Sequence, residues 1–211
     1  MKILAVSDKE TELFVFKDKK FNDVEFILSC GDLNENFLND LSVTLSKPIY
    51  YILGNHDPSI KGIKLLPKSN YIHLKFLILK KVVILGISGS LKYNSGENQY
   101  SQIEMYILTF FIILKYILKL IFLRRKNKKF IILTHSPIFD IHDIKDSSTH
   151  RGFRSFKILL KLLKPDLWIH GHIHLETHNS ERITKIKNTT IINIYGYKII
   201  EIKDGEISTS N

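Results

Sequence analysis

The chain has 211 residues, of which 44% are hydrophobic and 25% charged, and its formal net charge is +10 at pH 7. This length and balance suit one domain with its own buried core and exclude a disordered or fibrous protein. We therefore expect residues 1–211 to form a single domain. The one cysteine, Cys30, excludes an internal disulfide, and the first apolar stretch is too short for a signal peptide, so a cytoplasmic location is expected.

The positive charge carries no specific nucleic-acid signal. Lysines are scattered along the chain rather than gathered on one periodic face, and the single basic run, residues 124–129, is typical of a solvated turn. A nucleic-acid-binding module would be marked by strongly salt-dependent binding without hydrolysis. Net charge is the only feature that favours this class.

The spacing of apolar residues predicts an α/β protein. Short β-branched runs of the buried-strand type lie at residues 2–7, 24–29, 48–53, 81–88, 129–134 and 166–169. Helical spacing is found over 34–46 and 152–164, and Pro165 ends the second helix. After Arg182 apolar and polar residues alternate and the chain turns near Gly196, which predicts antiparallel strands.

The segment 105–123 is apolar enough to raise the question of a membrane span. Lys115 near its centre would cost about 2.5 to 3.5 kcal/mol in a bilayer, and Lys119 adds to this cost. On a helix both lysines fall on a narrow polar stripe with Ser101 and Glu104. We expect a helix covered by the rest of the protein or by a partner, such as a second copy in a homo-oligomer. Contact with a membrane surface is an alternative that is not favoured.

Polar residues of metal-binding type follow most of the strand-like runs. They are Asp8 and Glu10, Asp32, the GNHD sequence at 54–57, His135, and the GHIH sequence at 171–174. In an open α/β sheet the carboxyl ends of the strands form the ligand-binding edge. Carboxylate, amide and imidazole groups suit divalent cations, and a carboxylate such as Asp32 can bridge two of them. The sequence therefore predicts a binuclear metal site.

These motifs, in this order, resemble the signature of the calcineurin-like metallophosphoesterases, whose pattern is D-x-H, G-D, G-N-H-[DE], H and G-H-x-H. The match extends from residue 8 to residue 174. The resemblance implies a four-layer αββα sandwich, in which two mixed β-sheets are flanked by helices. It also implies a hydrolase that cleaves a phosphomonoester or phosphodiester by attack of a metal-bound hydroxide at a two-metal site.

The same resemblance implies a role for each motif residue. One ion would be held by Asp8, Glu10, Asp32 and His174. The other would be held by Asp32, Asn55, His135 and His172. His56 would steady the developing charge or protonate the leaving oxygen, and Asp57 would orient the imidazole of His56.

Glu10 stands where the family pattern has a histidine. Its extra negative charge is expected to favour Mn²⁺, with Mg²⁺, Fe and Zn²⁺ as alternatives, or to leave the first of the two divalent ions loosely held. The alternative is that Glu10 begins the following helix, where acidic residues are common in the first turn.

Further candidates lie in loops. His150 and Arg151 would offer a cation to the substrate phosphate, with Asn55 as another substrate contact, and the alternative is an ordinary surface loop. Tyr93 and Asn94 are expected at the rim of the site. The remaining histidines are interpreted as structural or carry no specific signal: His73, His142, His170 and His178.

Two classes of function stay open. The first is a phosphoester hydrolase that acts on a small phosphoester or nucleotide. The second is a catalytically weak scaffold of the same fold that binds a partner protein. Such scaffolds lack the histidine that this chain keeps as His56. A membrane span by residues 105–123 is incompatible with the predicted binuclear metal site. Asp32 precedes the segment and His172 follows it, so a bilayer would separate these two ligands.

Overall fold

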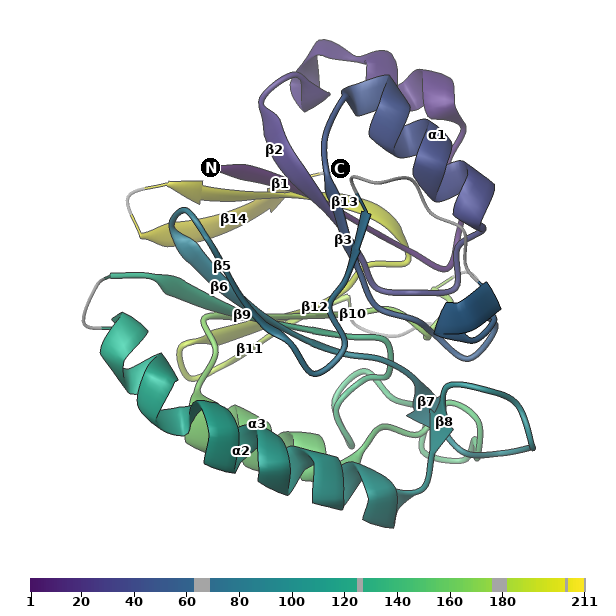
Figure 1. The fold of residues 1–211 in the computed structure, drawn as a ribbon, viewed down its shortest axis with the longest axis vertical. Helices are drawn as coiled ribbons and strands as arrows, with labels where there is room; N and C mark the ends of the chain where they lie inside the picture. Colours follow the sequence, from purple (N-terminus) through teal and green to yellow (C-terminus); the bar gives the residue numbers. More distant parts are fainter. Residues whose placement is uncertain (63–68, 125–126, 176–181, 204, 211) are drawn as a thin grey trace.

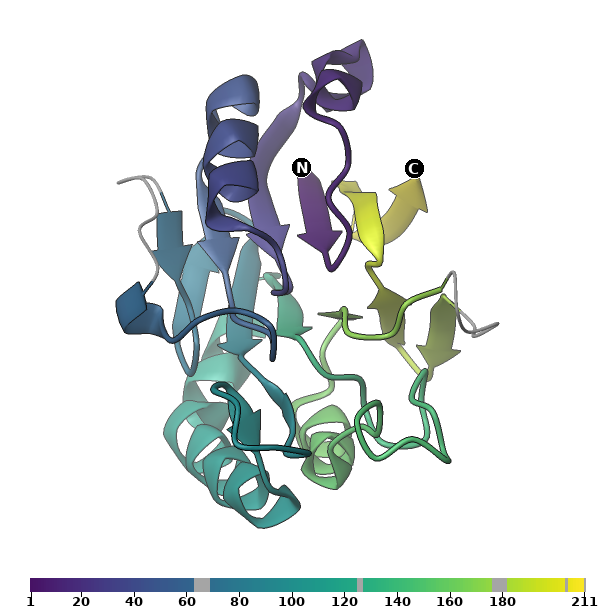
Figure 2. The ribbon, with the colours of Figure 1, turned by 90° about the vertical axis from the view of Figure 1, so that its right-hand side faces the viewer.

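Two six-stranded β-sheets pack face to face, and helices cover their outer faces (Figure 1). The computed structural model describes residues 1–62, 69–124, 127–175, 182–203 and 205–210. Helix α1 (Glu35–Leu45) lies at one end of this stack, and α2 (Gln102–Arg124) and α3 (Arg154–Leu163) lie at the other (Figures 1 and 2). The expected four-layer αββα sandwich is confirmed.

The first sheet has the strand order β14-β13-β1-β2-β3-β4. Strands β1 to β4 run parallel, whereas β13 pairs antiparallel with both β1 and β14. The strands are β1 (Lys2–Ser7), β2 (Val24–Ser29), β3 (Ile49–Tyr51), β4 (Ser69–Tyr71), β13 (Gly196–Lys203) and β14 (Glu206–Ser210).

The second sheet has the order β11-β12-β10-β9-β6-β5, and its two edge strands are antiparallel to their neighbours. Its strands are β5 (Phe76–Leu79), β6 (Val82–Ile87), β9 (Lys129–Thr134), β10 (Leu167–His170), β11 (Ile183–Ile186) and β12 (Thr189–Asn193). Two short strands, β7 (Ser90–Leu91) and β8 (Gln99–Tyr100), pair with each other beside it. Both large sheets are therefore mixed.

Three apolar clusters hold the four layers together. Successive side chains of a strand point to opposite faces, so a continuously apolar strand serves two interfaces. In β9, Ile131 packs between the sheets, whereas Ile132 packs toward α2 and α3. In β1, Ile3 likewise faces the second sheet and Leu4 faces α1. This double burial explains why the central strands show no polar alternation.

The helices begin and end where local chemistry requires. The Asn34 side chain accepts a hydrogen bond from the Asn36 N–H and caps α1. Ser101 and Glu104 bond to each other's backbone N–H, which forms a capping box at the start of α2. Helix α3 ends at Leu163. The next residue, Lys164, caps the helix with a left-handed φ of 43° and is followed by Pro165. Short 3₁₀ helices complete the chain: η1 (Leu13–Lys17), η2 (Lys19–Phe21) and η3 (Ile60–Gly62).

The C-terminal strands differ in one respect from the expectation. Strands β11 and β12 form an antiparallel pair, as do β13 and β14, but β12 pairs in parallel with β10 and β13 pairs with β1. The turn at Gly196, where φ is +80°, therefore carries the chain from one sheet to the other. The expected antiparallel strands are therefore confirmed within each pair, whereas the change of sheet between β12 and β13 was not predicted, because apolar spacing does not say which sheet a strand joins.

His73 is confirmed as a structural histidine. Its Nδ1 accepts a hydrogen bond from the Ser88 N–H at 2.9 Å, and its ring stacks near Tyr71 and Tyr100 with centroid distances of 5.9 Å and 6.1 Å. Burial lowers the pKa of His73 to about 4. A protonated Nδ1 would lose the bond from Ser88, so this corner of the fold requires the neutral imidazole.

A His73→Asn variant is expected to lose part of the acid sensitivity of folding. The folded-state pKa of His73 lies below its unfolded value, so its contribution to stability is present above pH 6.5 and is lost as the pH falls from 6.5 toward 4. The free energy of unfolding of the wild type should fall over this range by about 2 to 3 kcal/mol more than that of His73→Asn. Urea titrations in EDTA at a series of pH values measure this, and parallel pH profiles would contradict it.

Candidate metal centre

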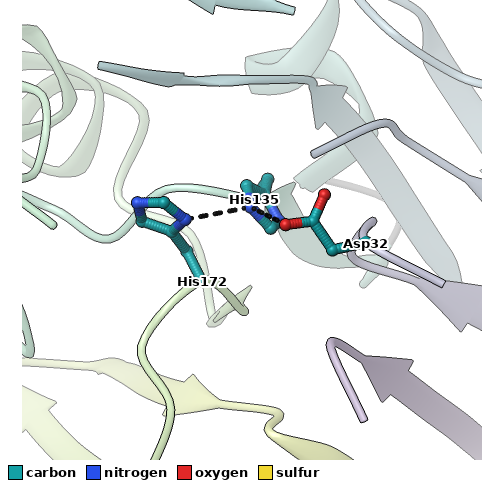
Figure 3. Close-up of side chains that lie close together, drawn as sticks. All are labelled: Asp32, His135 and His172. Carbon is teal, nitrogen blue, oxygen red and sulfur yellow. Dashed lines mark hydrogen bonds and ion pairs between the residues drawn. The ribbon is translucent and has the colours of Figure 1, made fainter. Parts of the chain in front are cut away.

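The predicted metal ligands come together at the carboxyl edge of the two sheets. Asp32 follows β2, His135 follows β9 and His172 follows β10. One ligand atom from each of these residues lies within 4.8 Å of the other two (Figure 3). The convergence expected from the strand ends is therefore present, and it joins both sheets.

Three potential ligand atoms surround a fourth, His135 Nε2. Asp32 Oδ2 lies 3.2 Å from it, Asn55 Oδ1 lies 3.0 Å away, and His172 Nδ1 lies 3.1 Å away. The amide of Asn55 is oriented by Tyr93, because Asn55 Nδ2 donates to the Tyr93 hydroxyl at 3.0 Å. This is the ligand set that the sequence assigned to the second ion.

Backbone carbonyls decide where the imidazole protons lie. The Cys30 carbonyl, 2.9 Å from His135 Nδ1, accepts a hydrogen bond and so holds the ring proton on Nδ1. The Thr149 carbonyl, 2.8 Å from His172 Nε2, does the same for the second ring. In their neutral forms the two rings then turn lone pairs toward each other and toward two oxygen acceptors. Such a group of lone pairs fits a divalent cation.

The electrostatics show that this point of the structure favours positive charge. Burial disfavours a charged His135, but the carboxylates of Asp32 and Asp8 and the Cys30 carbonyl together outweigh burial and raise the pKa of His135 to about 9. Burial also opposes the ionised Asp32, yet His135 lowers the pKa of Asp32 to about 2. Burial and then the charge of His135 lower the pKa of His172 to about 3. A proton on His135 thus occupies the place that suits a cation.

The ligand loops have an unusual backbone. Three residues, Asp8, Asp32 and His172, have positive φ values of 61°, 55° and 68°, which residues other than glycine rarely adopt. Backbone-to-carboxylate hydrogen bonds hold these turns: the His172 N–H donates to Asp8 Oδ2 at 2.9 Å, and the Asp32 N–H donates to Asp57 Oδ2 at 2.8 Å. The strain places the three side chains at the edge of the sheets.

The residues assigned to the first ion are only partly assembled. His174 Nε2 lies 3.8 Å from Asp8 Oδ1. Burial, with a smaller contribution from the charge of Asp32, raises the pKa of the Asp8 carboxyl despite the opposing effect of His135. Glu10 is exposed, and its Oε1 accepts a hydrogen bond from the Asn34 N–H at 3.3 Å. Glu10 therefore does not begin a helix, and its carboxylate contacts the start of α1; ligation of the first ion by Glu10 stays a prediction.

His56 and Asp57 follow directly after Asn55. The His56 N–H donates to Asp32 Oδ1 at 2.8 Å, and its side chain is exposed. Asp57 Oδ2 accepts hydrogen bonds from the N–H groups of Asp32 and Gly54, so this carboxylate braces the ligand loops. A cavity of about 400 Å³ opens beside Asp32, His56 and Asp57.

The loop candidates separate into two groups. The ring of His150 lies 5.3 Å from that of His172, and its Nδ1 contacts Ser147 Oγ at 2.8 Å. Arg151, in contrast, pairs with Asp143 at 3.0 Å and Asp140 at 3.3 Å, and its guanidinium lies over the ring of Phe139. A substrate contact by Arg151 would require these ion pairs to open.

The other histidines have structural surroundings where the structure describes them. His170 is fully buried, and its Nε2 lies 2.9 Å from His142 Nδ1, while His142 Nε2 lies 2.8 Å from Thr184 Oγ1. This His142–His170 pair was missed because residues 142 and 170 share no motif. The carbonyls of Cys30 and Thr149 were also missed, since main-chain groups leave no signal in a sequence. His178 lies outside the described residues.

Comparisons with known proteins agree with this fold. The family model "Calcineurin-like phosphoesterase" matches residues 5–176. One solved structure superposes with a TM-score of 0.69 at 15% identity, covering 100% of this chain and 98% of that chain. A dimetal phosphatase from Danio rerio gives 0.62 at 11% identity, with 100% and 95% covered. TT1561 of Thermus thermophilus gives 0.59 at 16% identity, with 100% and 98% covered.

A comparison with curated proteins found no match. The sandwich of two mixed sheets with imidazoles and carboxylates at one edge defines the class as a metallophosphoesterase fold. The family model covers most of the chain. The chain therefore belongs to the calcineurin-like phosphoesterase family.

Gly54→Ala is expected to weaken metal binding at least about tenfold, the size of effect typical of residues that support ligands. A Cβ at Gly54 would overlap Asp32 Oδ1 and His135 Cε1, so both ligands would have to move. Gly62→Ala is the matched control, because a Cβ there meets its nearest atom, of Pro58, at 3.4 Å. Calorimetric titration with MnCl₂ measures the effect. Equal affinity in the two variants would show that an ion does not use this ligand set.

Proposed function

We propose that the protein hydrolyses a phosphomonoester or phosphodiester with the help of two divalent metal ions. The observation that carries the proposal is a cluster of four ligand atoms. An imidazole nitrogen of His172, the amide oxygen of Asn55 and a carboxylate oxygen of Asp32 surround His135 Nε2. Bound divalent ions would supply Lewis acidity and lower the pKa of a water molecule toward neutrality. A cytoplasmic location and a small phosphoester or nucleotide substrate belong to the same proposal.

The residues of this chain divide the work. Asp32, Asn55, His135 and His172 hold one ion, and Asp8, Asp32 and His174 hold the other. His56 lies in the loop after β3, next to Asn55, and its side chain is exposed, so its imidazole can donate a proton to the leaving oxygen. Asp57 holds the loops at Asp32 and Gly54 through the backbone hydrogen bonds it accepts, and so supports the loop that carries His56. Asn55 and His150 are the proposed substrate contacts, and Arg151 joins them if its ion pairs open.

A catalytically weak scaffold that binds a partner protein is the competing function. The exposed His56 beside the ligand cluster favours the enzyme, because a scaffold has no use for a proton donor at that position.

Phosphoesterase activity is expected with Mn²⁺ on chromogenic monoester and diester substrates. His56→Ala should lower kcat about 100-fold to 10,000-fold, the usual contribution of a general acid. Asp32→Asn should lower activity at least as much, because the bridging carboxylate loses its charge. Asp23→Asn is the matched control, since the Asp23 side chain is 84% exposed and forms only a surface ion pair with Lys2. Equal rates in all four proteins would refute the catalytic assignment.

Glu10 is proposed as the additional ligand of the first ion, with Mn²⁺ preferred to Zn²⁺. Ligation requires the carboxylate to leave the Asn34 N–H. Glu10→Gln is then expected to reduce the bound Mn²⁺ from two ions per chain to about one, while Glu10→His should restore two and raise the affinity for Zn²⁺. Metal analysis after gel filtration measures the count. Two ions in Glu10→Gln would assign Glu10 to the capping of α1 instead.

A further inference from the structure

Helix α2 exposes an apolar face that no other described part of the chain covers. The inner side of the helix is buried against the second sheet, at Met105, Ile112, Tyr116, Leu120 and Leu123. The opposite side carries large apolar residues that are between 49% and 77% exposed: Ile103, Ile107, Phe110, Phe111, Leu114, Leu118, Ile121 and Phe122. We call these eight residues the outer face of α2. Contiguous apolar surface of this kind marks an interaction site.

The outer face continues onto the neighbouring helix. Helices α2 and α3 lie side by side, joined by a hydrogen bond from Thr109 Oγ1 to Ser155 Oγ at 3.0 Å (Figures 1 and 2). On α3, Ile158 and Leu162 are 38% and 47% exposed. Because α2 is in contact with the sheet from Met105 to Leu123, its outer face is presented along its length rather than at one end. The shape is that of a helix lying flat, not of a helix inserted end-on.

Basic side chains border this face. Lys115 and Lys119 are exposed and lie on one flank of α2, with their ammonium groups over the rings of Tyr116 and Phe76 at 5.2 Å and 5.6 Å. The sequence from Met105 to Phe139 contains no acidic residue. It contains seven basic residues: Lys115, Lys119, Arg124, Arg125, Lys126, Lys128 and Lys129. Apolar residues flanked by lysines suit an interface between lipid and water.

Either a second copy of the chain or a lipid surface could cover this apolar face, and the charge beside the face distinguishes the two. A second copy packed with α2 antiparallel to α2 would bring the Lys115 and Lys119 flanks of both copies together. In any pairing of the two helices, α2 offers no acidic residue beyond Glu104 to neutralise these lysines. An anionic lipid surface attracts the same lysines while its acyl region accepts the aromatic and aliphatic side chains. The complementarity favours lipid over self-association.

We propose that the outer face of α2 docks the protein on the surface of an anionic membrane. The helix lies in the plane of the interface, with the side chains of Phe110, Phe111, Leu114 and Leu118 entering the acyl boundary. Lys115 and Lys119 reach the headgroups. By length and composition α2 is the one helix among the described residues that could also cross a bilayer. Its packing against the sheet assigns it to the surface instead. Docking does not depend on the proposed hydrolysis.

The test is co-sedimentation of the purified full chain with vesicles of phosphatidylcholine, with or without phosphatidylglycerol. Binding is expected to the anionic vesicles and to weaken with salt. Phe111→Ser combined with Leu118→Ser should reduce the partition coefficient about 100-fold, because two large apolar side chains no longer leave water. Lys115→Gln combined with Lys119→Gln should reduce it about 30-fold, or roughly fivefold for each lysine.

The matched control is Phe14→Ser, which removes an aromatic side chain that is 67% exposed on η1, in the opposite outer layer. This variant should bind like the wild type. Thermal melts verify that all the variants fold, as expected for exposed positions. Binding that survives Phe111→Ser with Leu118→Ser would overturn the proposal, as would the absence of binding to anionic vesicles. A dimer in light scattering that these substitutions dissociate, without vesicle binding, would assign the face to a second copy and overturn it too.

Discussion

The hydrogen bonds from two histidine rings to main-chain carbonyls are the constraint on which the centre depends. His135 belongs to the second sheet, and the Cys30 carbonyl that fixes its proton belongs to the first. The two sheets must therefore stack so that their carboxyl edges coincide within the length of one hydrogen bond. The inter-sheet cluster, which includes Leu28 and Leu133 close to these edges, holds that alignment. The packing of the core therefore also positions the ligands. If the sheets slid past each other, the hydrogen bond from His135 to the Cys30 carbonyl would break and the ligand atoms would move apart.

Backbone strain is concentrated at the same edge. Asp8, Asp32 and His172 hold left-handed conformations that cost free energy, and the hydrogen bonds that maintain them come from other ligand loops. Glycines allow the close approach: a Cβ at Gly171 would overlap Ser7 Oγ and Asp8 Oδ2. Each loop is thus held in place by another loop of the candidate centre.

Much of the fold and of the second-ion ligand set could be predicted from sequence, because both leave local signals. Buried strands are apolar throughout, and the side chains that follow them have metal-binding chemistry. What could not be predicted depends on pairs of distant segments. Glu10 meets the Asn34 N–H only because two loops lie together. The Thr149 carbonyl has no side-chain signal, and the two apolar strands β12 and β13 carry no mark of the sheet that each joins.

Helix α2 shows the same limit in a different form. Its sequence is apolar on both sides of the helix. The periodicity therefore predicts that both sides are buried, but not whether the protein, a partner or a membrane buries them. The structure buries one side and leaves the other beside a row of lysines. The helix is also connected to the metal centre: it follows β8, and the β7–β8 loop carries Tyr93, whose hydroxyl accepts the bond from Asn55. Gln102, in the first turn of α2, bonds to the Arg154 N–H and the Gly152 carbonyl at the end of the loop that contains Thr149. A contact that holds α2 therefore acts on two supports of the candidate ligand set, which gives a surface contact a structural route to the candidate metal centre.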